Sequence, residues 1–223
     1  MKKEKNFWIG FGDIHENTTN LKKVHNIKEA DGIIVSGDIT FLGGKKRAIE
    51  IMGEIEKLNS TIYAQIGNMD KPEISEYLDE KGWNIHAKGK KLYSNIGIIG
   101  VGYSAPTPFN TPSEASEDTL LAWLYKAYKE VNDFEKLIMV SHTPPFGTKT
   151  DKISSGANVG SKNVYEFIKH VQPDICITGH IHESKGVDFI GKTKVLNPGA
   201  FGSGGYVIIE LDGDNLDAEI ITV

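Results

Sequence analysis

One stretch near the start of the chain sets its pattern, an apolar run that ends in glycine and then presents an acid and a histidine: Phe7-Trp8-Ile9-Gly10-Phe11-Gly12-Asp13-Ile14-His15. The run is short, apolar and rich in aromatic residues, which is typical of a buried strand. The glycine lets the backbone turn sharply and approach a ligand closely. The stretch therefore predicts a buried strand that carries ligand-type side chains just beyond its carboxyl end.

The same arrangement recurs four more times, each time as an apolar run, a small residue and then a polar side chain that can bind a metal. In chain order these later runs are followed by Asp38, by Asn68, by His142 and by the pair His180 and His182. In an open α/β sheet, ligands bind beyond the carboxyl ends of the strands. The pattern therefore predicts that seven side chains gather at one edge: Asp13, His15, Asp38, Asn68, His142, His180 and His182.

Segments with helical spacing of apolar residues separate these strands. Helices are expected over 17–30, 45–58, 72–80, 119–131 and 161–170, a strand hairpin over 91–101, and three or four short strands over 187–223. The loop 102–118 is long enough to be functional. The sequence leaves it equally open as a lid over the substrate or as a plain surface excursion.

The composition describes one ordinary globular domain over residues 1–223. Hydrophobic residues make up 39% and charged residues 25%, which excludes a disordered or collagen-like chain. The formal net charge of −5 disfavours broad binding to nucleic acid or to a membrane surface, because such binders usually carry basic patches. Whether the chain forms a homo-oligomer stays open.

Cysteine and histidine usage narrows the chemistry. One cysteine, Cys176, against seven histidines excludes an internal disulfide and cysteine-rich zinc sites. His25, His86 and His170 lie away from the strand ends, so we expect structural roles for them, and Cys176 is expected in the core. No signal peptide and no membrane span are recognised, so a cytoplasmic location is expected.

Seven ligand-type side chains exceed what one metal needs. A catalytic metal with open positions takes about three or four protein ligands. The mixture of histidine, aspartate and asparagine suits Mn, Fe, Co, Ni or Zn better than Mg or Ca. Two divalent ions can activate a water and stabilise both the attacking and the leaving oxygen of an in-line displacement at phosphorus. With two aspartates and a hydroxide they would leave a charge of roughly +1, so an acidic protein could still bind a phosphate there.

Five segments, in this order, resemble the motifs of calcineurin-like metallophosphoesterases: Gly12-Asp13-Ile14-His15, Gly37-Asp38, Gly67-Asn68-Met69-Asp70, Ser141-His142 and Gly179-His180-Ile181-His182. The segment Asn197-Pro198-Gly199-Ala200 is similar to the turn that follows in many small members. Each motif alone occurs often by chance, but five in order, each after a strand, are specific. The match covers most of the chain.

The resemblance implies an α/β fold, a four-layer α/β/β/α sandwich of two mixed sheets, with a dinuclear site between the sheet edges. By position it assigns to the first metal Asp13, His15, Asp38 and His182. It makes Asp38 the bridging ligand, and it assigns to the second metal Asn68, His142 and His180. The implied reaction is hydrolysis of a small phosphate ester, for which we favour a phosphodiester over a phosphomonoester, with Asp38, Asn68 and His142 as the expected catalytic residues.

One departure from the family pattern is Met69. Many members have a histidine there, which protonates the leaving group or stabilises the transition state, and small prokaryotic phosphodiesterases of the family often have cysteine. Methionine cannot donate a proton, so the sequence predicts a bias toward good leaving groups, or protonation by water. Asp70 would lose its usual histidine partner and is expected to be a structural turn residue.

The alternative function class is a non-catalytic metal-binding scaffold or protein-interaction module of the same fold, as in the retromer subunit that resembles this family. Such scaffolds tend to lose ligands, whereas all seven are present here. A nuclease acting on long DNA is disfavoured by the acidic chain and by the lack of an aromatic and basic stripe. The leading hypothesis is therefore a metal-dependent enzyme for a small phosphate ester.

Overall fold

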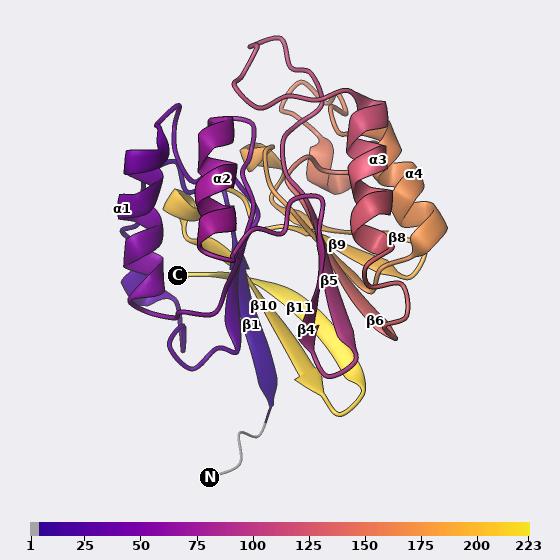
Figure 1. The fold of residues 1–223 in the computed structure, drawn as a ribbon. Coiled ribbons are helices and arrows are strands. Elements are labelled where there is room, and N and C mark those ends of the chain that lie inside the picture. Colours follow the sequence, from indigo (N-terminus) through magenta and orange to yellow (C-terminus); the bar gives the residue numbers. More distant parts are fainter. Residues whose placement is uncertain (1–4) are drawn as a thin grey trace.

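Two mixed β-sheets lie face to face in the computed structural model, which describes residues 5–223 (Figure 1). The first sheet has the strand order β11-β10-β1-β2-β3. Its strands β1, β2 and β3 are parallel, and β10 and β11 extend the sheet in antiparallel pairing beside β1. These five strands are β1 (Asn6–Phe11), β2 (Gly32–Val35), β3 (Ile62–Ala64), β10 (Gly205–Asp212) and β11 (Asn215–Thr222).

The second sheet has the strand order β4-β5-β6-β7-β9-β8. The inner strands β5, β6, β7 and β9 are parallel, and β4 and β8 pair antiparallel at the two edges. Every residue of β5 and β7 is buried, as expected for parallel strands that are covered on both faces. The six strands are β4 (Gly89–Tyr93), β5 (Ile96–Val101), β6 (Lys136–Ser141), β7 (Ile175–Thr178), β8 (Gly186–Ile190) and β9 (Thr193–Asn197).

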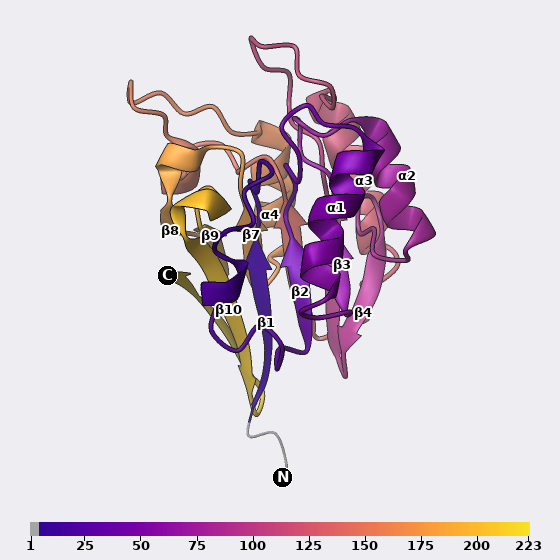
Figure 2. The same ribbon diagram turned by 90° about the vertical axis from the view of Figure 1, so that its left-hand side faces the viewer.

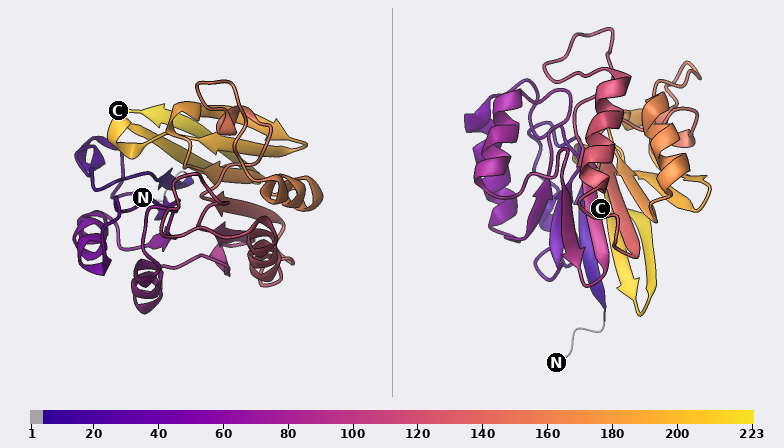
Figure 3. Two further views of the ribbon diagram at one scale, coloured as in Figure 1. Left: turned by 90° about the horizontal axis from the view of Figure 1, so that it is seen from above. Right: turned by 45° about the vertical axis from the view of Figure 1, so that its right-hand side comes forward.

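Helices form the two outer layers (Figure 3). The pair α1 (Lys45–Glu56) and α2 (Pro72–Glu80) packs on the first sheet, and α3 (Glu117–Tyr128) and α4 (Lys162–Val171) pack on the second. The hydroxyl of Ser161 accepts a hydrogen bond from the backbone N–H of Val164 and caps α4. The four-layer α/β/β/α sandwich predicted from the sequence is confirmed.

Three buried apolar clusters fill the three spaces between the four layers. Each contains side chains from both of the layers that it joins, so the burial of apolar area holds all four layers together. Cys176 lies fully buried in the cluster under α3 and α4, which confirms its predicted core role. Representative members, taken from the first to the second helical layer, are Met52 and Leu78, then Trp8 and Ile98, then Leu124 and Phe167.

The predicted helix over 17–30 is wrong. This segment contains one short 3₁₀ turn, Leu21–Lys23, followed by further turns. Val24 leaves the helical region at φ −65° and ψ 119°, and Asn26 has a positive φ of 54°. The buried apolar residues recur every three positions, a spacing that suits successive tight turns rather than the 3.6-residue period of an α-helix.

The loops that follow the carboxyl ends of the strands gather at one end of the sandwich. Segments 102–118 and 143–160 both project there, above the two sheets (Figure 2). The two C-terminal hairpins, β8–β9 and β10–β11, belong to different sheets. Among residues 5–223, none of the helices combines the length and the apolar character that crossing a bilayer requires.

Candidate metal centre

The structure brings together all seven ligand-type side chains identified in the sequence, and we call them the strand-end cluster. They come from the segments that follow β1, β2 and β3 in the first sheet and β6 and β7 in the second. Each member lies within 3.6 Å of another member through side-chain nitrogen or oxygen atoms. The strand-end cluster consists of Asp13, His15, Asp38, Asn68, His142, His180 and His182.

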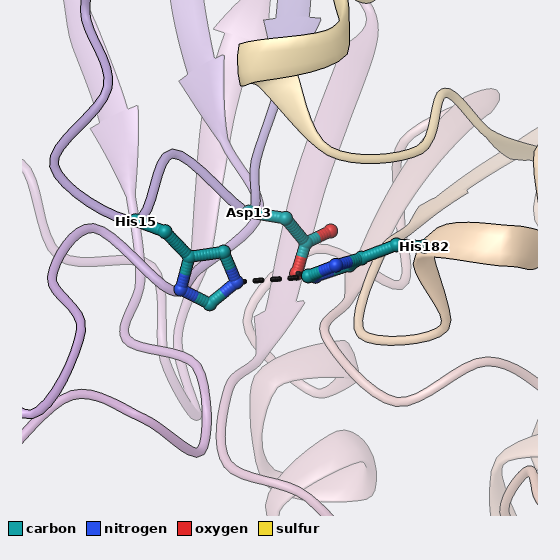
Figure 4. A group of neighbouring side chains, drawn as sticks. All are labelled: Asp13, His15 and His182. Atoms are coloured by element: carbon teal, nitrogen blue, oxygen red, sulfur yellow. Dashed lines mark hydrogen bonds and ion pairs between the residues drawn. The ribbon is translucent and has the colours of Figure 1, made fainter.

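The first part of the cluster contains Asp13, His15 and His182 (Figure 4). The His182 Nε2 atom lies 3.3 Å from Asp13 Oδ1 and 3.1 Å from His15 Nε2. Two imidazole nitrogens at this distance face each other with either one shared proton or a cation that both bind. All three side chains offer a ligand atom within 4.8 Å of the others, so together they could hold a metal ion.

A second group shares Asp13 and adds Asp38 and His142, again with ligand atoms within 4.8 Å of one another. The Asp38 Oδ2 atom lies 3.4 Å from His142 Nε2 and 3.6 Å from His15 Nε2. Asp38 therefore lies between one imidazole of each group. This is the location that the bridging role predicted for Asp38 requires.

Asn68 completes the cluster on the side of the second sheet. Its Oδ1 atom lies 3.0 Å from His142 Nε2 and 2.8 Å from His180 Nδ1. These are the three residues expected from the sequence to serve the second metal. One amide oxygen and two imidazole nitrogens thus converge on a single small volume.

Hydrogen bonds from outside the cluster hold its members in place. The Asp13 carboxylate accepts the backbone N–H of His180 at 3.0 and 3.1 Å, and Asp38 Oδ1 accepts the backbone N–H of Met69 at 2.8 Å. The Nδ1 atom of His142 lies 3.2 Å from the carbonyl oxygen of Ser36. When Nδ1 donates to that carbonyl, a deprotonated Nε2 would face the cluster with its lone pair, which is the usual way of orienting a metal-binding histidine.

The backbone at four cluster positions is left-handed, a conformation that is uncommon outside glycine. The φ angles are 48° at Asp13, 44° at His15, 50° at Asp38 and 68° at His180. Each such residue costs on the order of 1 kcal/mol or more, and residues of this kind collect at functional sites. The residue types do not indicate this backbone conformation, because most aspartate and histidine residues do not adopt it.

Two glycines allow the close approach of the strand ends. A Cβ atom on Gly37, whose φ is 121°, would lie 2.6 Å from the backbone nitrogen of Gly67 and 2.7 Å from His142 Nδ1. A Cβ atom on Gly67 would lie 2.5 Å from His142 Cε1. Real Cβ contacts are not this short, so a side chain at either position would push His142 out of the cluster.

Charge in the cluster is unbalanced without a cation. Asp13 and Asp38 are 1% and 2% exposed, and within residues 5–223 the ion-pair partners of both are histidines. Burial works against the charged form of Asp38, but the neighbouring His142 outweighs it and the pKa of Asp38 is lowered. Burial likewise works against His142⁺, but Asp38 and Asp13 raise the pKa of His142 to about 9. Two buried carboxylates thus require positive charge, and divalent metals fit this donor set.

Asp70 has the structural role that the sequence predicted. Its carboxylate is fully buried and accepts hydrogen bonds from the backbone N–H groups of Ile39, Thr40 and Gly67 at 3.0, 2.7 and 3.0 Å. Burial, reinforced by the charge of Asp38, raises the pKa of Asp70 to about 6. The side chain thus joins the loop after β2 to the loop after β3, which places Asp38 beside Asn68.

The three remaining histidines lie outside the cluster, as expected. His25 is exposed in a turn, and His170 lies in the last turn of α4. His86 accepts the backbone N–H of Gly102 at its Nδ1 atom, 3.1 Å away. Its ring packs against Tyr103 and Trp123, and burial lowers the pKa of His86 to about 4.

Two contacts at the rim of the site were not foreseen. The hydroxyl of Thr111, in the loop 102–118, accepts a hydrogen bond from Asn68 Nδ2 at 2.9 Å. The ring of Phe41 lies 5.7 Å from the ring of His15, centroid to centroid, and Phe41 is 60% exposed. In the sequence, length alone marked the loop 102–118, and Phe41 carried no signal.

Comparison with protein families and with curated proteins places the chain among known sequences. A family model described as "Metallophosphoesterase, calcineurin superfamily" matches residues 118–221. An uncharacterized protein of Methanocaldococcus jannaschii is 35% identical over 195 residues, which span 85% of this chain and 86% of that protein.

Solved structures share the fold at low sequence identity. A protein of Thermus thermophilus aligns with a TM-score of 0.75 at 18% identity, covering 96% of this chain and 98% of that one. A dimetal phosphatase of Danio rerio aligns with a TM-score of 0.67 at 11% identity, covering 99% of each chain. A putative 5′-nucleotidase of Staphylococcus aureus aligns with a TM-score of 0.62 at 16% identity, covering 98% of this chain and 54% of that one. At these identities the likeness concerns the fold.

Proposed function

The chain belongs to the calcineurin superfamily of metallophosphoesterases, and on that premise we propose that it hydrolyses small phosphate esters, with phosphodiesters preferred over phosphomonoesters. The observation that carries the proposal is the strand-end cluster, in which seven ligand-type side chains from both sheets meet at one edge. Non-catalytic scaffolds of this fold tend to lose ligands, so the presence of all seven supports the enzyme.

We assign the cluster to two divalent metal ions, drawn from Mn, Fe, Co, Ni and Zn. When bound, such a pair supplies an activated water and stabilises negative charge on the phosphoryl oxygens. Asp38 would contribute to both positions, since it lies between His15 and His142. The first position takes Asp13, His15, Asp38 and His182, and the second takes Asp38, Asn68, His142 and His180.

The protein contributes orientation. Backbone N–H groups of His180 and Met69 fix the carboxylates of Asp13 and Asp38, so these ligands do not reorganise when substrate binds. The Ser36 carbonyl fixes the ring of His142. Asp38, Asn68 and His142 meet at the centre of the cluster, which supports the catalytic roles that we propose for them.

Met69 shapes the substrate preference. Its backbone N–H is engaged with Asp38, and its thioether side chain has no proton to donate. The leaving group must therefore depart as an anion or take its proton from water, which favours esters with acidic leaving groups.

Phe41 supports the preference for diesters. A phosphodiester carries two organic groups, so the group that does not leave needs a surface on which to rest. The exposed ring of Phe41, next to His15, offers an apolar face at the rim of the cluster. We propose a small organic substrate rather than a nucleic acid, because the net charge is −5 and opposes binding of long polyanions.

The test is metal analysis of the purified protein together with a panel of chromogenic phosphodiesters and phosphomonoesters that span a range of leaving groups. We expect about two divalent metals per chain and faster turnover of diesters. Hydrolysis of monoesters only would refute the diester preference. A protein that binds no divalent metal and hydrolyses nothing with added Mn²⁺ would refute the enzyme and favour a scaffold.

A further inference from the structure

Within residues 5–223, Asn68 is the one member of the strand-end cluster whose side chain makes a hydrogen bond to the loop 102–118. Its Nδ2 atom donates to the hydroxyl oxygen of Thr111 at 2.9 Å. The same hydroxyl lies 2.6 Å from a carboxylate oxygen of Glu114. A continuous path of hydrogen bonds therefore runs from Glu114 through Thr111 to Asn68.

The direction of each bond in this path follows from the chemistry of the groups. An ionised carboxylate only accepts hydrogen bonds, so the single hydroxyl proton of Thr111 must point toward Glu114. The hydroxyl then offers only lone pairs to Asn68, and only the NH₂ group of the amide can use them. The amide oxygen must consequently face the other way, toward His142 and His180, which it approaches at 3.0 and 2.8 Å.

Glu114 is held as an acceptor by several donors. It accepts the hydroxyl of Thr107 at 2.6 Å and the backbone N–H of Thr111 at 2.8 Å, besides the hydroxyl of Thr111. Partial burial works against its charge, but these hydrogen bonds outweigh that cost and lower the pKa of Glu114 to about 2. Glu114 therefore remains a carboxylate over the whole working range of pH.

The loop is also anchored to the backbone on both sides of Met69. The N–H of Ser113 donates to the carbonyl oxygen of Asn68 at 3.0 Å, and the hydroxyl of Ser113 donates to the carbonyl oxygen of Asp70 at 2.6 Å. Ser113 is fully buried. These bonds hold Thr111 at a constant place relative to Asn68, so the loop 102–118 is part of the site's framework.

We propose that Thr111 and Glu114 are positioning residues that orient the amide of Asn68, so that its oxygen and not its nitrogen faces the metal centre. The inference rests on the proposed function, because orientation matters only if Asn68 binds a metal. With the amide reversed, the NH₂ group would face His142 and His180, and a protonated nitrogen cannot be a ligand. Thr111 would then have to donate to Asn68, and Glu114 would lose the hydroxyl proton of Thr111 as one of its donors.

The experiment compares Thr111→Val, which removes the hydroxyl and keeps the shape, with Thr111→Ser, which keeps the hydroxyl. Thr107→Val is the matched control, because it removes the other hydroxyl bound to Glu114 without touching Asn68. Each variant is freed of metal and titrated with Co²⁺, and the visible absorption of the bound ion is followed. Full-length wild-type protein is titrated in parallel.

We expect Thr111→Val to weaken binding of the more weakly held Co²⁺ by about 10–100-fold and to change its absorption bands. The loss of a hydrogen-bond partner of a metal ligand typically has an effect of this size. Thr111→Ser should stay within a few-fold of wild type, and Thr107→Val likewise. Glu114→Ala, which removes the carboxylate oxygen that accepts the Thr111 hydroxyl, should weaken Co²⁺ binding in the same direction as Thr111→Val. This variant also decides the matter if Thr111→Val does not fold.

The positioning role is overturned if Thr111→Val binds Co²⁺ as wild type does, or if Thr107→Val weakens binding by the same factor. These outcomes differ from failure of the proposed function. If the proposed function failed, the wild-type protein itself would bind no divalent metal and hydrolyse no ester.

Discussion

Histidines at two places in this protein are surrounded by opposite chemistry. In the strand-end cluster the imidazoles of His15, His142 and His182 face carboxylates at 3.3 to 3.6 Å. In a second group, which we call the aromatic cluster, His86 packs against the rings of Tyr103 and Trp123, which also contact each other. Both lie beside the same loop, because Gly102 donates to His86 and Thr111 accepts from Asn68.

The two groups show that neighbouring charge, and not burial by itself, decides the state of a histidine. The pKa of His142 rises to about 9 although its side chain is fully buried, because Asp38 lies 3.4 Å away. The pKa of His86 falls to about 4, because burial among aromatic rings disfavours the protonated imidazole and this outweighs the opposing charge of Asp79. His180 supports this comparison from within the strand-end cluster. Its ring touches Asn68 rather than a carboxylate, and burial lowers the pKa of His180 to about 4.

The largest expected effect comes from the charge at the centre of the strand-end cluster. Asp38→Asn removes the carboxylate that lies between His15 and His142, so kcat/KM should fall by about 10³-fold, equivalent to about 4 kcal/mol. Steady-state kinetics on a chromogenic diester would measure the loss. The control is Asp212→Asn, in an exposed position at the end of β10. Activity of Asp38→Asn within tenfold of wild type would remove Asp38 from the site.

The aromatic cluster should make stability depend on pH. His86 is neutral in the folded chain down to about pH 4, whereas the unfolded chain takes up a proton near pH 6.5. The contribution of neutral His86 to the free energy of unfolding is therefore complete above pH 6.5. It is lost as the pH falls toward 4, and the total loss is roughly 3 kcal/mol. Lys126 and Lys88 add to the lowered pKa and Asp79 opposes it.

His86→Asn tests this dependence, because its side-chain oxygen can accept the Gly102 N–H in place of Nδ1. Urea unfolding of both proteins at pH 7.0, 5.5 and 4.5 gives the difference in their free energies of unfolding. The variant should lose less stability than wild type as the pH falls. Equal losses over this range would show that His86 is not held neutral.

Removal of the metal should lower stability through the strand-end cluster and leave the aromatic cluster unaffected. A ligand at 100 times its dissociation constant adds about 2.7 kcal/mol to stability, which for a chain of this size raises Tm by roughly 5–10 °C. Mn²⁺ should therefore raise the Tm of the chelator-treated protein, and His142→Ala should abolish the shift. His86→Asn should keep it. A shift that survives His142→Ala would place the metal elsewhere.

The smallest effect is expected at Met69, beside the strand-end cluster. Met69→His supplies a proton donor, so hydrolysis of esters with poor leaving groups should rise by up to about 10²-fold relative to good ones. The measurement is the slope of log kcat/KM against leaving-group pKa in a diester series, which should become shallower. An unchanged slope would mean that leaving-group protonation does not limit the enzyme.

Much of the fold was predictable because its signals are local. Apolar runs such as 175–179 end in glycine, and each leads into its ligand within one or two residues, so strand and ligand are predicted together. The segment 17–30 forms turns although its pattern predicts a helix, because a three-residue spacing of apolar residues resembles a helical face over a short window. The hairpins β8–β9 and β10–β11 look alike in sequence, yet they join different sheets, because strand pairing depends on partners far away in the chain.

The sequence by itself determined which side chains the site contains, because residue type and position after a strand are properties of the chain alone. The tertiary structure decided how they meet: that Asp38 lies between His15 and His142, that four positions take left-handed backbone, and that Thr111 turns the amide of Asn68. Thr111 and Asn68 are 43 residues apart. Contacts of this kind depend on the packing of two sheets and on the directions of individual hydrogen bonds, neither of which a linear pattern encodes.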